Sequence, residues 1–109
     1  MKNRELKFRA WDKKRKKMFH FEIDDTIAIG YLEIMQFFNI KDKSGKEIYE
    51  GDLFKLGAEK QVFEVKFEHG CFMAFRNGKQ FGLIGELQIC FIDVIGNIYE
   101  NPELLQDAV

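Results

Sequence analysis

The sequence predicts a mainly β protein, a β-rich α+β fold built on a twisted antiparallel sheet with one short C-terminal helix. Two observations predict it: apolar and polar residues alternate with a period of two, and short polar or glycine-containing turns separate the alternating runs. The chain has 109 residues, of which 46% are apolar and one is proline. This length and composition fit a single domain covering residues 1–109 and exclude a disordered or collagen-like chain.

The alternation is clearest in three runs, which we interpret as half-buried strands: residues 6–11, 18–23 and 63–68. Three turn signals separate runs of this kind: residues 12–17, residues 68–70 and the pair Asn77-Gly78. Asn-Gly accepts the positive φ angles of a tight two-residue hairpin. The order of runs and turns therefore predicts a meander of hairpins.

Two further segments complete the prediction. Residues 26–40 fit a helical stripe and also a strand, and we favour a strand for 32–40. Near the C-terminus, Asn101 supplies a side-chain acceptor at a helix N-cap, Pro102 suits the first helical position, and Glu103 places a carboxylate near the positive end of the helix. This pattern predicts a short helix over residues 102–107.

Charge is divided unevenly along the chain, although the net charge is only −1. Residues 1–20 hold nine basic and two acidic residues, a balance of +7, and the remaining 89 hold eight basic and sixteen acidic residues, a balance of −8. Such asymmetry is compatible with an end that binds a polyanion, or with copies of the chain that meet head to tail.

The two cysteines, Cys71 and Cys90, lie in otherwise apolar surroundings, and the chain opens without an apolar signal core. These features predict a cytoplasmic protein with reduced thiols. No window approaches the roughly 18 consecutive apolar residues of a membrane span, so we expect no membrane partner.

Three segments resemble the signature blocks of the YopX family, in that family's order: residues 7–12 with 16–18, residues 40–52, and residues 94–105. The second and third share Ile-Tyr-Glu, fifty positions apart, which we interpret as two similar turns at strand ends. The resemblance implies a protein of bacteriophages, prophages and their hosts, with a sheet closing into a small barrel-like (SH3-like) core. The family has no established biochemical activity.

The turns of these blocks are candidate site positions: Asp42, Gly45, Tyr49, Glu50, Gly51, Asp52, Gly96, Asn97, Tyr99 and Glu100. The sequence departs from the family pattern before the second block, where Gln36-Phe37-Phe38-Asn39-Ile40 stands in place of a Gln-Tyr-Thr-Gly-Leu type run. Asn39 can occupy a left-handed position as glycine would, so we expect the bend to survive.

A basic run beside an aromatic residue is the candidate nucleic-acid site: Trp11, Lys13, Lys14, Arg15, Lys16 and Lys17. Cations at such a tip neutralise phosphates, and an aromatic ring offers a stacking face for a base. The alternative is a solvated charged turn, with a structural tryptophan at the end of a strand.

Acidic residues offer an enzymatic alternative, best placed at Glu50 and Asp52, where two carboxylates could bind a metal or share a proton. We favour a turn in which Asp52 accepts backbone N–H groups. The two histidines and two cysteines lack the spacing of a zinc clamp. We therefore expect no cofactor, no metal and no enzymatic activity.

Twelve phenylalanines are too many for one small core. Those at 37, 38, 72, 75, 81 and 91 cannot all be buried, so we expect some to face another chain and the protein to form homo-oligomers. The resulting hypothesis is an uncharacterised phage or prophage accessory protein that acts by non-catalytic binding or self-assembly, with a host or phage protein as a further partner. The alternative is a small nucleic-acid-binding module that uses residues 13–17, and the third is a metal-dependent enzyme.

Overall fold

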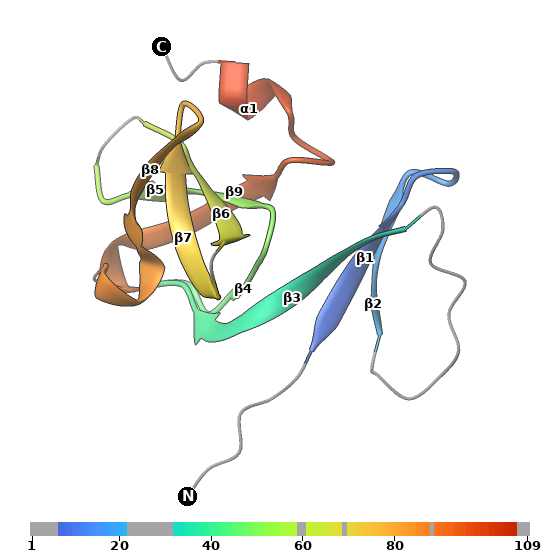
Figure 1. The fold of residues 1–109 in the computed structure, drawn as a ribbon, viewed down its shortest axis with the longest axis horizontal. Coiled ribbons are helices and arrows are strands. Elements are labelled where there is room, and N and C mark those ends of the chain that lie inside the picture. Colours follow the sequence, from blue (N-terminus) through green and yellow to red (C-terminus); the bar gives the residue numbers. More distant parts are fainter. Residues whose placement is uncertain (1–6, 22–31, 59–60, 69, 88, 107–109) are drawn as a thin grey trace, which may run out of the picture.

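The structure is a computed structural model that describes residues 7–21, 32–58, 61–68, 70–87 and 89–106. Two antiparallel sheets and a short helical turn make up the described part of the chain (Figure 1). The first sheet has the order β2-β1-β3-β4 and the second the order β8-β7-β6-β5-β9. The predicted mainly β class is confirmed.

The first sheet consists of β1 (Phe8–Asp12), β2 (Lys17–Phe21), β3 (Leu32–Lys41) and β4 (Glu47–Tyr49). The second consists of β5 (Asp52–Leu56), β6 (Phe63–Glu68), β7 (Cys71–Arg76), β8 (Lys79–Leu83) and β9 (Ile92–Asn97). Two 3₁₀ turns, η1 (Ile84–Glu86) and η2 (Ile89–Phe91), lie between β8 and β9, and α1 (Glu103–Gln106) follows β9.

The second sheet curls into a half-barrel around the main hydrophobic core (Figure 1). This arrangement agrees with the expected barrel-like packing. The core residues are Ile48, Phe54, Phe63, Val65, Ala74, Ile84, Ile92 and Val94, each at most 8% exposed. All but two belong to strands of the half-barrel itself, while Ile48 comes from β4 and Ile84 from η1. The half-barrel therefore depends on ordinary burial of apolar side chains.

Strand β3 runs from the β1–β2 hairpin toward the half-barrel (Figure 1), and within the first sheet its first half pairs with β1 and its second half with β4. The strand predicted for 32–40 is confirmed, and residues 26–31 lie outside the described residues. The register with β4 shifts between Phe37 and Lys41, and Asn39 within this interval has a φ of +70°. The predicted left-handed conformation of Asn39 is thus confirmed, and it coincides with the irregularity in β3.

The predicted turns are also present. Asn77 and Gly78 have φ angles of +53° and +75°, as the tight hairpin between β7 and β8 requires. Gly70, with a φ of +79°, precedes β7. In the turn between β1 and β2, the backbone N–H of Lys16 donates to the carbonyl oxygen of Asp12 over 2.7 Å.

Helix α1 covers Glu103–Gln106, so it begins one residue later than predicted, and the predicted end at 107 lies outside the described residues. At the start of α1, Asn101 accepts the backbone N–H of Leu104 with its carbonyl oxygen over 3.1 Å. Its side-chain oxygen accepts the backbone N–H of Asn97 over 3.2 Å, upstream of the helix. Among the described residues, no helix has the length and apolar character needed to cross a membrane.

Strand β1 departs from the predicted half-buried pattern, because residues on both of its faces are buried. Ala10 is fully buried on one face, and Arg9 on the other is only 8% exposed. Arg9 lies opposite His20 and Met35 in the register, so these three side chains share the face that meets the half-barrel. We call this the inner face of the first sheet.

The opposite, outer face of the first sheet carries Phe8, Phe19, Phe21 and Ile34. The register pairs Ala10 with both Phe19 and Ile34, and Phe8 with Phe21, which sets these side chains on one side of the sheet. The ring of Phe21 lies 6.0 Å from that of Phe8 and 6.0 Å from that of Phe19, measured between centroids. Phe19 is 37% exposed and Ile34 is 40% exposed.

The prediction that the phenylalanines cannot all be buried is confirmed. Phe37 is buried, whereas Phe81 and Phe91 are about half exposed, and Phe67 on β6 is also exposed. Cys71 and Cys90 are both free and exposed.

Candidate functional site

Two of the sequence blocks meet at a buried ion pair on the seam between the sheets. The guanidinium Nη2 of Arg9 on β1 donates to Asp52 Oδ1 at the start of β5 over 2.6 Å. The side chains are only 9% and 2% exposed. Because removal of one partner would leave an uncompensated buried charge, the pair fixes how the first sheet sits on the half-barrel.

Further contacts hold the two side chains of this pair. The second oxygen of Asp52 accepts the backbone N–H of Tyr49 over 2.8 Å, and Arg9 Nη2 also donates to the carbonyl oxygen of Glu50 over 3.1 Å. The guanidinium carbon of Arg9 lies 4.7 Å from the centre of the Tyr49 ring, a cation–π contact. The role expected for Asp52, as an acceptor of a backbone N–H in this turn, is confirmed.

A second ion pair lies just before the start of β1. Lys7 Nζ donates to Glu47 Oε2 over 2.5 Å, and the hydroxyl of Tyr49 donates to Glu47 Oε1 over 3.2 Å. Lys7 and Arg9 are two residues apart and therefore project from the same face of the strand. The first sheet thus presents two cations to two carboxylates of the second sequence block.

Burial and hydrogen bonding shift the acidities at the seam in different directions. Burial raises the pKa of Asp52, although Arg9 opposes the effect. The hydrogen bond from Lys7 lowers the pKa of Glu47. Burial, together with the neighbouring Glu47, raises the pKa of Tyr49 to about 12. Burial also raises the pKa of Glu50, whose Oε1 accepts the backbone N–H of Gln36 over 2.9 Å.

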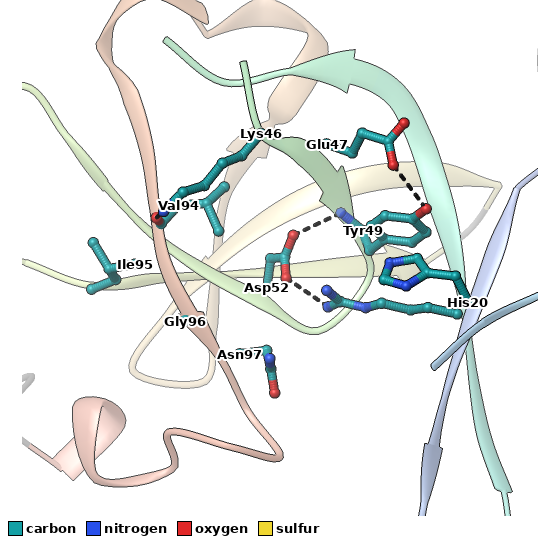
Figure 2. Close-up of a pocket in the computed structure, with 10 residues that line it drawn as sticks. His20, Lys46, Glu47, Tyr49, Asp52, Val94, Ile95, Gly96 and Asn97 are labelled. Atoms are coloured by element: carbon teal, nitrogen blue, oxygen red, sulfur yellow. Dashed lines mark hydrogen bonds and ion pairs between the residues drawn. The ribbon is translucent and has the colours of Figure 1, made fainter. Parts of the chain in front are cut away.

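An open cavity of about 370 Å³ lies over this seam (Figure 2). It is lined by residues from β1, β2, β4, β5 and β9 and by the turn before β4. His20 stands beside Tyr49, with ring centroids 5.5 Å apart in an edge-on arrangement. Lys46 lies on the opposite side, where its Nζ donates to the carbonyl oxygen of Val94 over 3.2 Å (Figure 2). The cavity is therefore bordered by basic side chains on two sides.

Asp42 ties the turn before β4 to the edge of β9. The residue is only 5% exposed. Its carboxylate accepts the backbone N–H groups of Ser44, Lys46 and Val94 over 2.8 to 2.9 Å. Burial raises the pKa of Asp42, but these N–H groups outweigh burial and hold it below its ordinary value. Gly45 completes the turn with a φ of +87°. Asp42 is therefore a structural acceptor.

The third block forms a comparable turn after β9. The side-chain oxygen of Asn97 accepts the backbone N–H groups of Tyr99 and Glu100, and its amide donates to Glu100 Oε1 over 2.8 Å. A Cβ at Gly96 would overlap the Asn101 side chain, so glycine is required there. The two Ile-Tyr-Glu turns meet where the N–H of Ile98 donates to the carbonyl oxygen of Gly51 over 2.9 Å.

Gly51 allows the first sheet to approach closely. Its φ is +85°, and a Cβ there would lie 3.2 Å from the sulfur of Met35 on the inner face. The turns predicted from the family blocks therefore converge on the seam, where they hold Arg9 and the inner face of the first sheet.

The candidate nucleic-acid residues lie apart from the cavity, in the turn between β1 and β2. Residues 13–17 are all exposed. Arg15 pairs with Asp12 over 3.1 Å, and Lys13 pairs with Glu33 over 3.1 Å. Trp11 stacks on Tyr99, with centroids 5.7 Å apart and the rings inclined by 19°. Nucleic-acid contact stays a prediction.

Sequence reasoning missed Arg9, His20 and Lys46. Arg9 occupied a polar position of an alternating strand, and no sequence signal showed that its partner would be Asp52, 43 positions away. The only sequence feature that pointed to Arg9 was its place in the first family block. Among the described residues, no group of three or more His, Cys, Asp or Glu side chains could hold a metal ion.

Comparison with known proteins places this chain in a family. Residues 19–106 match the sequence model of the YopX protein family. The structure resembles that of protein EF1440 from Enterococcus faecalis, with 27% identity, a TM-score of 0.61 and coverage of 94% of this chain and 99% of that chain. It also resembles protein yopX from Bacillus subtilis, with 25% identity, a TM-score of 0.61 and coverage of 91% and 95%. No curated protein matches the sequence. The chain belongs to the YopX family.

Proposed function

We propose that this YopX-family protein acts by non-catalytic binding, in which copies of the chain associate through the outer face of the first sheet. It serves as an accessory protein of a phage or prophage in the cytoplasm of the bacterial host. The observation that carries the proposal is the group of large apolar side chains on that face, of which Phe19 is 37% and Ile34 40% exposed. Adjacent exposed apolar side chains typify surfaces that bind other proteins.

The uneven distribution of charge along the chain favours a second copy of the chain as the partner. Residues 1–20, which include β1 and most of β2, have a balance of +7, and the rest of the chain has a balance of −8. Opposite charges on two parts of one chain attract the unlike parts of two copies. Phe81 and Phe91, each about half exposed in the acidic part, offer apolar contacts there. A host or phage protein is the alternative partner.

The hydrogen bonds of the candidate acid–base carboxylate Asp52 favour a binding role over a catalytic one. Asp52, one of the two candidate acid–base groups, uses one oxygen for Arg9 and the other for the N–H of Tyr49, so it stabilises the seam. A general acid or base needs a hydrogen-bonding site free for substrate.

The test is sedimentation analysis over a range of protein concentrations, with Phe19→Ser as the disruptive variant. Its matched control is Phe67→Ser, which removes a phenylalanine of similar exposure, 44%, from the half-barrel. We expect the wild-type and control chains to self-associate and Phe19→Ser to remain monomeric. A monomeric wild-type chain at high concentration would contradict the proposal, and so would equal self-association of all three proteins.

Nucleic-acid binding by the basic turn is the second candidate, favoured by the exposure of all five cations at residues 13–17. Fluorescence anisotropy with labelled DNA and RNA, at low and physiological salt, tests it. If the turn binds phosphates, affinity falls as salt rises and is lost when residues 13–17 are neutralised. The control neutralises Lys43 and Lys66, which lie elsewhere. Absence of binding at low salt would eliminate this candidate.

A further inference from the structure

The cavity at the seam has the size and setting of a small-ligand site. Its volume of about 370 Å³ falls within the range of ligand pockets, roughly 300 to 1,000 Å³. Strands from both sheets contribute to it, and turns of the second and third sequence blocks border it (Figure 2). The apolar outer face of the first sheet lies on the other side of β1 and β2, so this site is separate from the self-association surface.

The acidic groups of the cavity are already satisfied. Asp52 uses one oxygen for Arg9 and the other for the N–H of Tyr49. Glu47 likewise accepts Lys7 with one oxygen and the Tyr49 hydroxyl with the other. Both carboxylates therefore carry a donor on each oxygen, and neither calls for a cationic ligand.

The basic groups, by contrast, have unused donors. Lys46 Nζ donates one hydrogen bond, to Val94, whereas an ammonium group can donate three. The ring of His20 is exposed and contacts Tyr49. Within the part of the chain that the structure describes, the buried Nε of Arg9 has no acceptor. Arg9 itself is 91% buried, since its side chain is 9% exposed. The cavity therefore offers unused hydrogen-bond donors to a ligand.

We propose that this cavity binds a small anionic ligand that carries carboxylate or phosphate oxygens at two ends. Lys46 binds one end, and His20 binds the other. The two side chains stand on opposite sides of the cavity, which is why the ligand needs acceptors at both ends (Figure 2). Charge-assisted hydrogen bonds of this kind are stronger than neutral ones.

The experiment is an NMR titration of the full chain with inorganic pyrophosphate and, separately, with citrate, at constant ionic strength. Each probe carries oxygens at two ends and is smaller than the cavity. We expect saturable shifts of the His20 ring signals with at least one probe. Binding of pyrophosphate alone would identify a phosphate-bearing ligand, and binding of citrate alone would identify a polycarboxylate. Binding of both would indicate an oxyanion site that does not distinguish phosphate from carboxylate.

Two variants and a matched control locate the site. Lys46→Gln removes the ammonium, and His20→Phe keeps a ring against Tyr49 but removes its nitrogens. Each should weaken binding about tenfold, the loss typical of one hydrogen bond to a charged group. Lys43→Gln changes a second exposed lysine of the same turn, outside the cavity lining, and should leave binding unchanged.

Two outcomes would overturn the proposal. One is the absence of saturable shifts with either probe in a folded wild-type chain. The other is equal binding by wild type, Lys46→Gln and His20→Phe, which would indicate nonspecific attraction of anions. The amide spectrum of each variant shows whether it is folded, and the oligomeric state does not enter the readout. Failure here therefore leaves the self-association proposal intact.

Discussion

The half-barrel and the first sheet differ in what stabilises them. The half-barrel encloses the main cluster of buried apolar side chains, and successive strands β5 to β8 pair with their neighbours in the chain. The β1–β2 part of the first sheet instead rests on the half-barrel through the Arg9–Asp52 ion pair and the Trp11–Tyr99 stack, while Lys7, just before β1, pairs with Glu47 of β4. Apolar burial holds the half-barrel together with β4 and the second half of β3, whose Ile48, Phe38 and Ile40 pack into its core. Polar and aromatic contacts instead hold β1 and β2.

This difference means that the two regions should respond unequally to mutation. A cavity in the half-barrel core removes stability that the whole domain needs, because the seam contacts depend on it. Loss of a seam contact should release β1 and β2 while the half-barrel stays folded. The following predictions test this division, in order of decreasing effect.

Phe63→Ala should have the largest effect. Phe63 is fully buried and packs against Phe54, with ring centroids 5.4 Å apart. We expect a loss of about 4 kcal/mol in the free energy of unfolding, measured by denaturant titration. Phe67→Ala, at a 44% exposed position on the same strand, should cost less than about 1 kcal/mol. Equal losses would refute the view that this core holds the domain together.

Asp52→Ala should release β1 and β2 from the half-barrel. It leaves the buried Arg9 without its carboxylate and removes the acceptor of the Tyr49 N–H, at a cost of about 3 kcal/mol. Hydrogen exchange should accelerate in β1 and β2 and change little in β6 and β7. Uniform acceleration over all strands would show that the two regions unfold as one. Arg9→Met combined with Asp52→Leu should restore part of the loss, since no buried charge remains unpaired.

Asp42 should make the link between the turn before β4 and β9 sensitive to acid. Because its pKa in the folded chain lies below the ordinary value of 3.8, the ionised carboxylate stabilises the fold. That contribution is complete well above pH 3.8 and is lost as the pH falls from there through the folded-state pKa.

Asp42→Asn tests this pH dependence. At neutral pH it should lower the free energy of unfolding by about 2 kcal/mol, because an amide cannot accept all three N–H groups. Denaturant titrations at several pH values should then show a flatter acid dependence than in the wild type. An unchanged acid profile would mean that another carboxylate, such as Asp12 or Glu47, whose pKa values are also lowered, dominates.

Asn77→Ala should have the smallest effect and remain local. Asn77 is exposed and has a φ of +53°, a conformation that costs alanine about 1 kcal/mol more than asparagine or glycine. Asn77→Gly should be nearly neutral. Faster hydrogen exchange confined to β7 and β8 in the alanine variant is the expected result, and a change in the first sheet would contradict the division into two regions.

The local features of this protein were set by its sequence. Alternating residues predicted β6, the Asn77-Gly78 pair predicted the hairpin after β7, and Asn39 predicted a left-handed position in β3. Each depends on the φ and ψ preferences of a few neighbouring residues or on a period of two, so a short window suffices. The C-terminal helix was also found, although it begins one residue later than predicted.

Only the tertiary structure decided which side chains meet at the seam. Arg9 and Asp52 are 43 positions apart, and Trp11 and Tyr99 are 88 apart, so their contacts depend on how β3 carries the first sheet across the half-barrel. The alternation in β1 would by itself expose Arg9. The carboxylate of Asp52 offsets the free-energy cost of burying the Arg9 guanidinium. Local sequence preferences cannot specify this partner, because the favourable free energy arises only when the two side chains meet in the folded protein.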